Sequence, residues 1–330
     1  PDDFQGCGIK KIQSAQLLIL QRIPQQALYL MTVTQSQHSI TVFGHRGARG
    51  IYPENTMAGF RYLQDIDITA VEIDVQNTAD RLSVLVHDAH LLIPQDNGAI
   101  PVHQLVRHTT AAQLADLQVG IHHSKDGYAA LFPDQAYLPD ERIPTFATFC
   151  EWAAQAPKLF VNVEIKSDAA QLDLYDPPDV IVEDVVTLLE QHNLSGRTVL
   201  SSFDWRVLFA CAERAPALTR GYLTLEDTHG TSMTPNIIDG SLWMGGATRA
   251  DHGGCLLKTI AALGGKIWCP FYKDLTADAL AKAQDLGLVV NVWTVNTLDD
   301  INRMADMGVN GIISDYPARV RNVLMQRGKA

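Results

Sequence analysis

The chain has 330 residues, of which 46% are hydrophobic and 19% are charged, and its formal net charge is −11. This ordinary globular composition argues against wholesale disorder and against a small disulfide-stapled fold. The acidic balance argues against non-specific nucleic-acid binding, because neutralising phosphates requires a basic surface. A chain of this length suits either two domains or one large α/β barrel.

The five cysteines lie far apart and form no CxxC pair, which indicates neither a disulfide framework nor a structural zinc site. No apolar run reaches the roughly 18 residues that a membrane helix needs, so we expect no transmembrane segment. The cysteine usage favours a reducing, cytoplasmic compartment. A periplasmic or secreted location stays open, since a signal peptide could precede Pro1. The oligomeric state is also left open.

The first 30 residues do not fit the pattern of the rest. Their apolar run at 17–20 is short, and Pro24 interrupts any helix that follows it. We expect residues 1–30 to be an extension outside the core, and residues 31–330 to form a single domain. The alternative is that the extension docks a partner.

From residue 40 onward, short apolar runs alternate with amphipathic stretches. The expected strands are 40–44, 70–76, 82–87, 160–166, 198–203, 219–225, 266–271, 288–295 and 311–314. Amphipathic helices are expected at 178–192, 205–215, 277–286 and 298–307. This alternation is typical of a parallel sheet, in either a (β/α)₈ barrel or a doubly wound fold.

The third expected strand differs from the others. About five residues join it to the second strand, which is too few for a helical crossover and predicts an antiparallel hairpin. The hairpin leaves eight strands for a barrel and brings His87 to the level of Glu72 and Asp74. Residues 89–142 then interrupt the alternation of strands and helices. We interpret them as an insertion after this third strand, mostly irregular with a short helix or two. Such an excursion is either a lid or specificity element, or a plain loop.

Polar residues gather where the expected strands end. They are His45, Arg46, Glu72, Asp74, His87, Glu164 and Lys166. The C-terminal ends of parallel barrel strands face one mouth. The two-residue period of a strand places Glu72 with Asp74, and Glu164 with Lys166, on one face.

This set of side chains suits metal-assisted chemistry on a phosphoester. Three clustered carboxylates repel one another unless a cation lies between them, and oxygen ligands suit Mg²⁺ or Ca²⁺ better than zinc. Arginine and lysine beside that ion suit a phosphate. Two histidines beside the phosphate indicate one general base and one general acid.

A series of short motifs runs through the chain in order. They are HRGARG at 45–50, PENT at 53–56, VEIDV at 71–75, HD at 87–88, RIPT at 142–145, EIK at 164–166, SSFD at 201–204, VWTVN at 292–296 and ISD at 313–315. The set resembles the glycerophosphodiester phosphodiesterase family. The resemblance covers about residues 40 to 316, nearly all of the chain beyond the extension.

The resemblance implies a TIM barrel that hydrolyses glycerophosphodiesters to glycerol 3-phosphate and an alcohol. It implies that Glu72, Asp74 and Glu164 hold a divalent cation, Mg²⁺ or Ca²⁺, and that His45 and His87 are the acid–base pair. The remaining roles that it implies are phosphate binding by Arg46 and Lys166, substrate contacts by Trp293, Phe203 and Asn55, and a supporting role for Glu54. The family route uses the 2-hydroxyl of the substrate and passes through a cyclic phosphate.

Two other functions are weighed against this one. A relative that acts on lysophospholipids would need an apolar acyl groove, and a barrel that only binds phosphodiesters should have lost some of the polar residues. All of those residues are present. The stretch after Asp88 departs from the family pattern, which leaves the preferred alcohol open.

Overall fold

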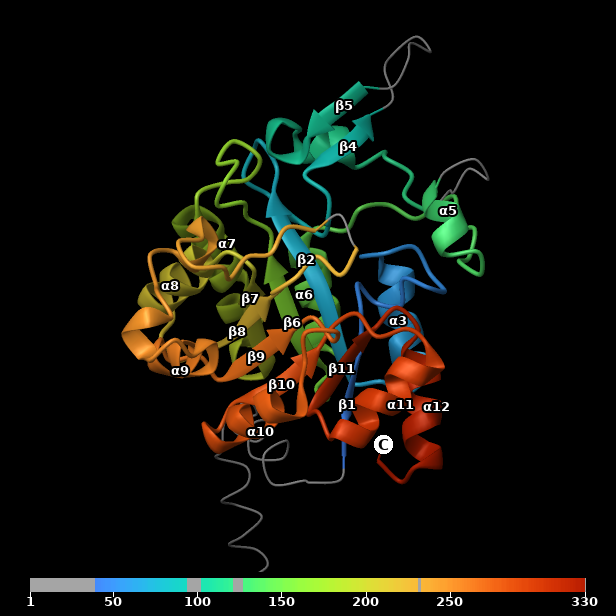
Figure 1. The fold of residues 1–330 in the computed structure, drawn as a ribbon. Coiled ribbons are helices and arrows are strands. Elements are labelled where there is room, and N and C mark those ends of the chain that lie inside the picture. Colours follow the sequence, from blue (N-terminus) through green and yellow to red (C-terminus); the bar gives the residue numbers. More distant parts are fainter. Residues whose placement is uncertain (1–38, 94–101, 121–126, 231–232, 330) are drawn as a thin grey trace, which may run out of the picture.

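The computed structural model describes residues 39–93, 102–120, 127–230 and 233–329. In this part of the chain eight parallel strands form a closed barrel (Figure 1). They are β1 (Thr41–Gly44), β2 (Ala70–Asn77), β6 (Phe160–Ile165), β7 (Thr198–Ser202), β8 (Thr219–Thr224), β9 (Ile267–Pro270), β10 (Val289–Val292) and β11 (Gly311–Ser314). Strand β1 pairs with both β2 and β11, and this closes the sheet. The TIM-barrel prediction is confirmed.

A helix follows each barrel strand along the chain and packs outside it. They are α3 (Met57–Asp65), α6 (Phe146–Ala154), α7 (Pro178–Gln191), α8 (Trp205–Arg214), α9 (Leu256–Ala262), α10 (Ala277–Asp285), α11 (Leu298–Met307) and α12 (Pro317–Gln326). The four expected helices, now α7, α8, α10 and α11, are confirmed to within one residue. Short 3₁₀ turns occur at Val106–His108, Ser195–Arg197, Leu242–Met244 and Ala250–His252.

Several helices begin at a threonine that caps them. The side chains of Thr56, Thr145, Thr276 and Thr297 each accept a hydrogen bond from a backbone N–H three residues further on. Such a cap satisfies one of the backbone donors that the first turn of a helix leaves free. The sequence therefore fixes where these helices start.

The barrel strands divide their side chains between two cores. In β2 the outward Val71, Ile73 and Val75 join the large cluster beneath the helices. The inward Ala70 joins a second cluster inside the barrel, level with Phe43 and Phe160 on the neighbouring strands. The N-terminal half of the barrel is thus filled by apolar side chains, which leaves the polar ones for the C-terminal mouth.

The predicted hairpin is confirmed, but its second strand is short. Strand β3 (Ser83–Val84) runs antiparallel to β2 with Gln76 opposite Val84. Beyond it the chain leaves the sheet, because the Gln76 side-chain amide donates to the carbonyls of Val86 and Asp88. These side-chain bonds replace strand pairing over the rest of the expected 82–87 strand.

The insertion lies over the C-terminal ends of the barrel strands (Figure 1). It contains the antiparallel pair β4 (His90–Ile93) and β5 (Val102–Leu105) and the short helices α4 (Ala111–Leu114) and α5 (Gly127–Leu131). The short helices were expected, whereas the β4–β5 pair was not. A small apolar core formed by Val84, Val86, Val106 and Leu114 lies beneath it. A hairpin needs such a packed face to be stable, so the pair depends on contacts distant in sequence.

The prediction of an extension at residues 1–30 falls outside the described residues and stays a prediction. Within the described ranges, no helix has the length and apolar character that crossing a membrane requires.

Gly44 ends β1 where the chain turns toward the mouth. A Cβ at this position would lie 1.9 Å from the carbonyl oxygen of Gly47. Because that neighbour is backbone, Gly44→Ala should lower the free energy of unfolding by at least about 2 kcal/mol in urea denaturation. Gly196→Ala is the matched control, since a Cβ there meets nothing within 4 Å. Equal unfolding free energies for the two variants would contradict this prediction.

Candidate active site

The loop after β1 carries the first group of site residues. Arg46 has a φ of 51° and Gly47 a φ of 88°, so the chain turns sharply here. This turn directs the Arg46 backbone N–H to Glu72 Oε2 at 2.9 Å. The left-handed conformation of a non-glycine residue is uncommon and is often found at functional sites. Here it binds the loop to a carboxylate of the neighbouring strand.

Three carboxylates meet inside the mouth. Glu72, Asp74 and Glu164 each place one oxygen within 4.8 Å of the others, and their side chains belong to residues that are only 3%, 1% and 9% exposed. The register of the sheet explains this, because Asp74 lies opposite Glu164 across the β2–β6 pair. Burial, with Asp74 and Glu164 nearby, raises the pKa of Glu72 well above its ordinary value.

Two cationic side chains lie among these carboxylates. Arg46 contacts Asp74 through Nε at 3.1 Å and donates from Nη1 to Glu54 Oε1 at 2.9 Å. Lys166 donates from Nζ to Glu164 Oε1 at 2.6 Å and lies 3.5 Å from Asp74 Oδ1. Burial would raise the pKa of Asp74, but Arg46, His87 and Lys166 outweigh it and lower that pKa. Both predicted phosphate-binding residues are thus paired with carboxylates.

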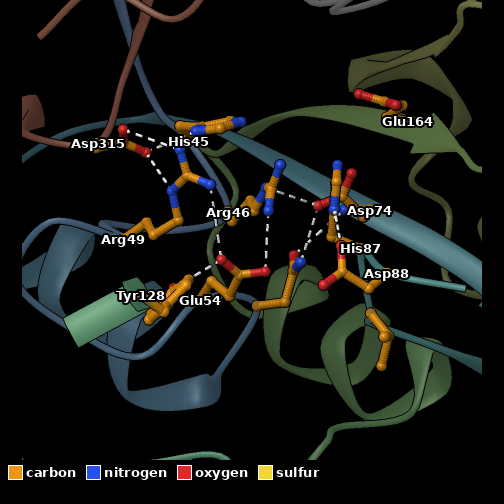
Figure 2. Close-up of polar contacts among 12 residues, drawn as sticks. His45, Arg46, Arg49, Glu54, Asp74, His87, Asp88, Tyr128, Glu164 and Asp315 are labelled. Carbon is orange, nitrogen blue, oxygen red and sulfur yellow. Dashed lines mark hydrogen bonds and ion pairs between the residues drawn. The ribbon is translucent and has the colours of Figure 1, made fainter. Parts of the chain in front are cut away.

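His45 is held by a carboxylate from the last barrel strand (Figure 2). Its Nδ1 lies 2.7 Å from Asp315 Oδ1, and its Nε2 lies 3.8 Å from Glu72 Oε2. Arg49 donates two hydrogen bonds to Asp315, at 2.8 Å and 3.1 Å. An ionised carboxylate only accepts, so Nδ1 carries the proton and Nε2 keeps a free lone pair. Burial lowers the pKa of His45 to about 4.

His87, which follows the β2–β3 hairpin along the chain, lies beside Asp74 (Figure 2). Its Nδ1 lies 2.7 Å from Asp88 Oδ1, and its side chain is about one-third exposed. The two histidines are therefore in different surroundings. His45 is buried against a fixed carboxylate, whereas His87 is held by an exposed neighbour at the edge of the insertion.

A cavity of about 250 Å³ joins these groups. Its polar walls include His45, Arg46, Glu72, His87 and Glu164, and its apolar walls include Phe203 and Trp293. The Phe203 and Trp293 rings pack edge to face at 5.2 Å, and Trp293 Nε1 donates to Cys269 O at 2.8 Å. A polar half and an apolar half together suit a ligand with both a charged group and carbon-bound hydrogens.

The structure brings most of the predicted residues together at this cavity. Asn55 is placed differently, behind the carboxylates: its Nδ2 donates to Asp74 Oδ2, and its Oδ1 accepts from Asp74 N. Glu54 lies at the mouth, where Tyr128 of the insertion donates to its Oε2 at 2.7 Å. Glu54 therefore links Arg46 to the insertion.

Four further residues at the site had no predicted role. Asp315 was visible in the sequence as the polar residue that directly follows the last strand. Asn162 could have been found too, because it precedes Glu164 by two and so shares its face, and it lines the cavity. Arg49 stands in the first motif, but its partner is distant in sequence. Nothing in the sequence of the insertion distinguishes Tyr128.

The donor set fits a divalent cation. Among the described residues, the ion-pair network joins the carboxylates of Glu54, Asp74, Glu164 and Asp315 to three cationic side chains, so carboxylates outnumber cations even before Glu72 is counted. Within the described structure, Glu72 Oε1 and Asp74 Oδ1 are buried and accept no hydrogen bond. Hard oxygen donors with unused lone pairs and surplus negative charge are what Mg²⁺ and Ca²⁺ bind.

Comparison with known proteins agrees with this geometry. The model of the glycerophosphoryl diester phosphodiesterase family matches residues 45–319. A glycerophosphodiester phosphodiesterase from Caldanaerobacter subterraneus is 26% identical over 287 residues, covering 87% of this chain and 98% of that protein.

Solved structures share the fold. A Silicibacter pomeroyi chain named as a candidate glycerophosphoryl diester phosphodiesterase is 32% identical, with a TM-score of 0.77 and coverage of 92% of this chain and 99% of that one. An Oleispira antarctica phosphodiesterase, solved with the product sn-glycerol-3-phosphate, is 22% identical, with a TM-score of 0.63 and coverage of 88% and 99%. By its motifs, its fold and the family model that covers most of its length, the chain belongs to the glycerophosphoryl diester phosphodiesterase family.

Proposed function

We propose that this protein hydrolyses glycerophosphodiesters to glycerol 3-phosphate and an alcohol. The observation that carries the proposal is the buried carboxylate cluster of Glu72, Asp74 and Glu164 between two histidines in the barrel mouth. Family membership supports the reaction class, and the product bound to the Oleispira relative supports the glycerol 3-phosphate half.

Glu72, Asp74 and Glu164 would hold the divalent cation. When bound, such an ion supplies positive charge that stabilises the developing charge on phosphate oxygens and favours the alkoxide of a hydroxyl. Arg46 and Lys166 are each paired with these carboxylates. With such an ion bound, both cationic side chains would be available to bind the phosphate.

The two histidines divide the proton transfers of the first step. His45 lines the cavity together with Trp293, and Asp315 holds its Nδ1, so we assign its Nε2 as the acceptor of the proton of the glycerol 2-hydroxyl. The 2-oxygen forms a bond to phosphorus, and the bond from phosphorus to the alcohol oxygen breaks. His87, on the insertion side, gives its proton to the departing alcohol. A hydroxyl already bound beside the phosphate has a large effective concentration.

The second step reverses these roles. His87 is now neutral and accepts a proton from a water, whose oxygen bonds to phosphorus. The bond between phosphorus and the 2-oxygen breaks, and His45 returns its proton to that oxygen. Glycerol 3-phosphate is formed, and both histidines return to their starting protonation states. Trp293 and Phe203 pack against the glycerol carbons throughout, and their edge-to-face contact keeps this wall rigid.

The first test is release of glycerol 3-phosphate from glycerophosphocholine and glycerophosphoethanolamine, with Mg²⁺, with Ca²⁺ and with chelator. We expect release that depends on the metal. An analogue lacking the 2-hydroxyl should react at least about a thousandfold more slowly, because it has no internal nucleophile. Equal rates for the analogue would contradict the cyclic route. Release from lysophospholipids alone would instead assign the protein to the lysolipid class.

A second test separates metal binding from activity. Excess Mg²⁺ or Ca²⁺, at about a hundred times its Kd, should raise the melting temperature by about 5 °C. Glu72→Gln removes one charged ligand without changing the shape of the side chain, and it should abolish this metal-dependent rise. Glu151→Gln, an exposed position on α6, is the matched control and should keep it. An unchanged rise in Glu72→Gln would place the ion elsewhere.

A third test addresses Asp315, a positioning residue for His45. Asp315→Asn removes the anionic acceptor for Nδ1–H and permits the wrong tautomer. By analogy with other carboxylate-oriented histidines, kcat should fall by at least about a hundredfold. KM should change little, because Asp315 lies behind His45. Asp285→Asn, an exposed position on α10, controls for the substitution itself. A rise in KM with unchanged kcat would make Asp315 a binding residue instead.

A further inference from the structure

A second cavity, of about 380 Å³, lies on the insertion side of the site. His87 lines both this cavity and the one that holds the carboxylates, so the two meet at that residue. Glu54 and Asn55 line the second cavity but not the first. In the proposed first step His87 gives its proton to the oxygen of the departing alcohol. The rest of that alcohol would therefore extend into the second cavity.

The walls of this cavity are largely hydrocarbon. They include Val86, Leu91, Leu92, Leu117, Val119 and Ile143. Leu91, Leu117 and Ile143 also pack on the small core of the insertion, which fixes this wall in place. Leu92 is 52% exposed, so its side chain is available to a ligand in this cavity.

The charged groups among the described lining residues are already engaged. Glu54 is paired with Arg46 and with Tyr128, and Asp88 is paired with His87. Among the other lining residues, Gln118 donates its amide to Pro139 O at 2.9 Å. A cationic alcohol placed here would find carboxylates whose charge is already shared, whereas a hydrocarbon group would find apolar side chains.

The position of the cavity decides which half of the substrate it can receive. Trp293, proposed to pack on the glycerol carbons, follows β10, which lies three strands away from β2 around the closed ring of eight. The second cavity lies beyond His87, on the β2 side. With phosphorus between the histidines, the glycerol and the alcohol point to opposite sides. The alcohol is therefore the half that reaches the insertion.

We propose that this cavity binds the leaving alcohol, and that it selects alcohols with an uncharged hydrocarbon body over charged or hydroxylated ones. The inference rests on the proposed function, since it concerns the same site. It assigns the insertion as the element that determines specificity, through Leu92 and Val119 in particular.

The test compares matched diesters. Glycerophosphocholine and its neutral isostere, the 3,3-dimethylbutyl diester, differ in charge but not in shape. We expect kcat/KM to be about tenfold higher for the neutral diester. Among ethyl, butyl and hexyl diesters, kcat/KM should rise by up to about fourfold for each methylene buried. A preference for choline, or no change with chain length, would overturn the proposal. Hydrolysis of none of them would instead refute the proposed function.

Substitutions in the cavity wall test whether the alcohol preference arises in this cavity. Leu92→Asn and Val119→Asn should lower the ratio of kcat/KM for the hexyl diester to kcat/KM for the ethyl diester at least about fivefold. Leu242→Asn is the matched control, because Leu242 is similarly exposed at 64% and lies outside both cavities. Equal losses for the ethyl and hexyl diesters would show that the alcohol lies elsewhere. The melting temperature of each variant confirms that it is folded.

Discussion

The mutual repulsion of three buried carboxylates is the constraint on which the rest of the site depends. Removing such charges from water is costly, and close like charges add to that cost. The chain offsets it with partners from several elements: the Arg46 guanidinium and backbone N–H, the Lys166 ammonium and the Asn55 amide. The sharp turn after β1 places two of these partners, the Arg46 guanidinium and the Arg46 backbone N–H, beside the carboxylates. Even so, the carboxylates outnumber their cationic partners, which is the charge balance expected where a cation binds.

Much of this arrangement could be predicted from the sequence, because it depends on local rules. Strand alternation places Glu72 and Asp74 on one face, and the parallel barrel brings strand ends to one mouth. The hairpin followed from a connection too short for a helix. These rules concern spacing along the chain, and spacing is what a sequence displays directly.

The parts of the site and fold that could not be predicted depend on contacts between segments that are distant in sequence. The role of Asp315 requires knowing that β11 closes the barrel beside β1. Asn55 sits in a motif, but only the fold shows that both ends of its amide bind Asp74. The insertion was the least predictable part, since its β4–β5 pair depends on a small core assembled from separate turns of chain. No periodic pattern marks such a core.

The pair His45–Asp315 joins residues 270 positions apart in the chain. The ends of the barrel meet beside it, where Ile40 N donates to Lys329 O at 2.9 Å. Contacts of such long range carry a large loop-closure entropy, so they form late in folding. Helices and adjacent strand pairs can assemble while His45 still lacks its carboxylate. His45, the proposed base, thus becomes oriented only when the last strand docks against the first, so we expect activity to return during refolding with barrel closure rather than with secondary structure.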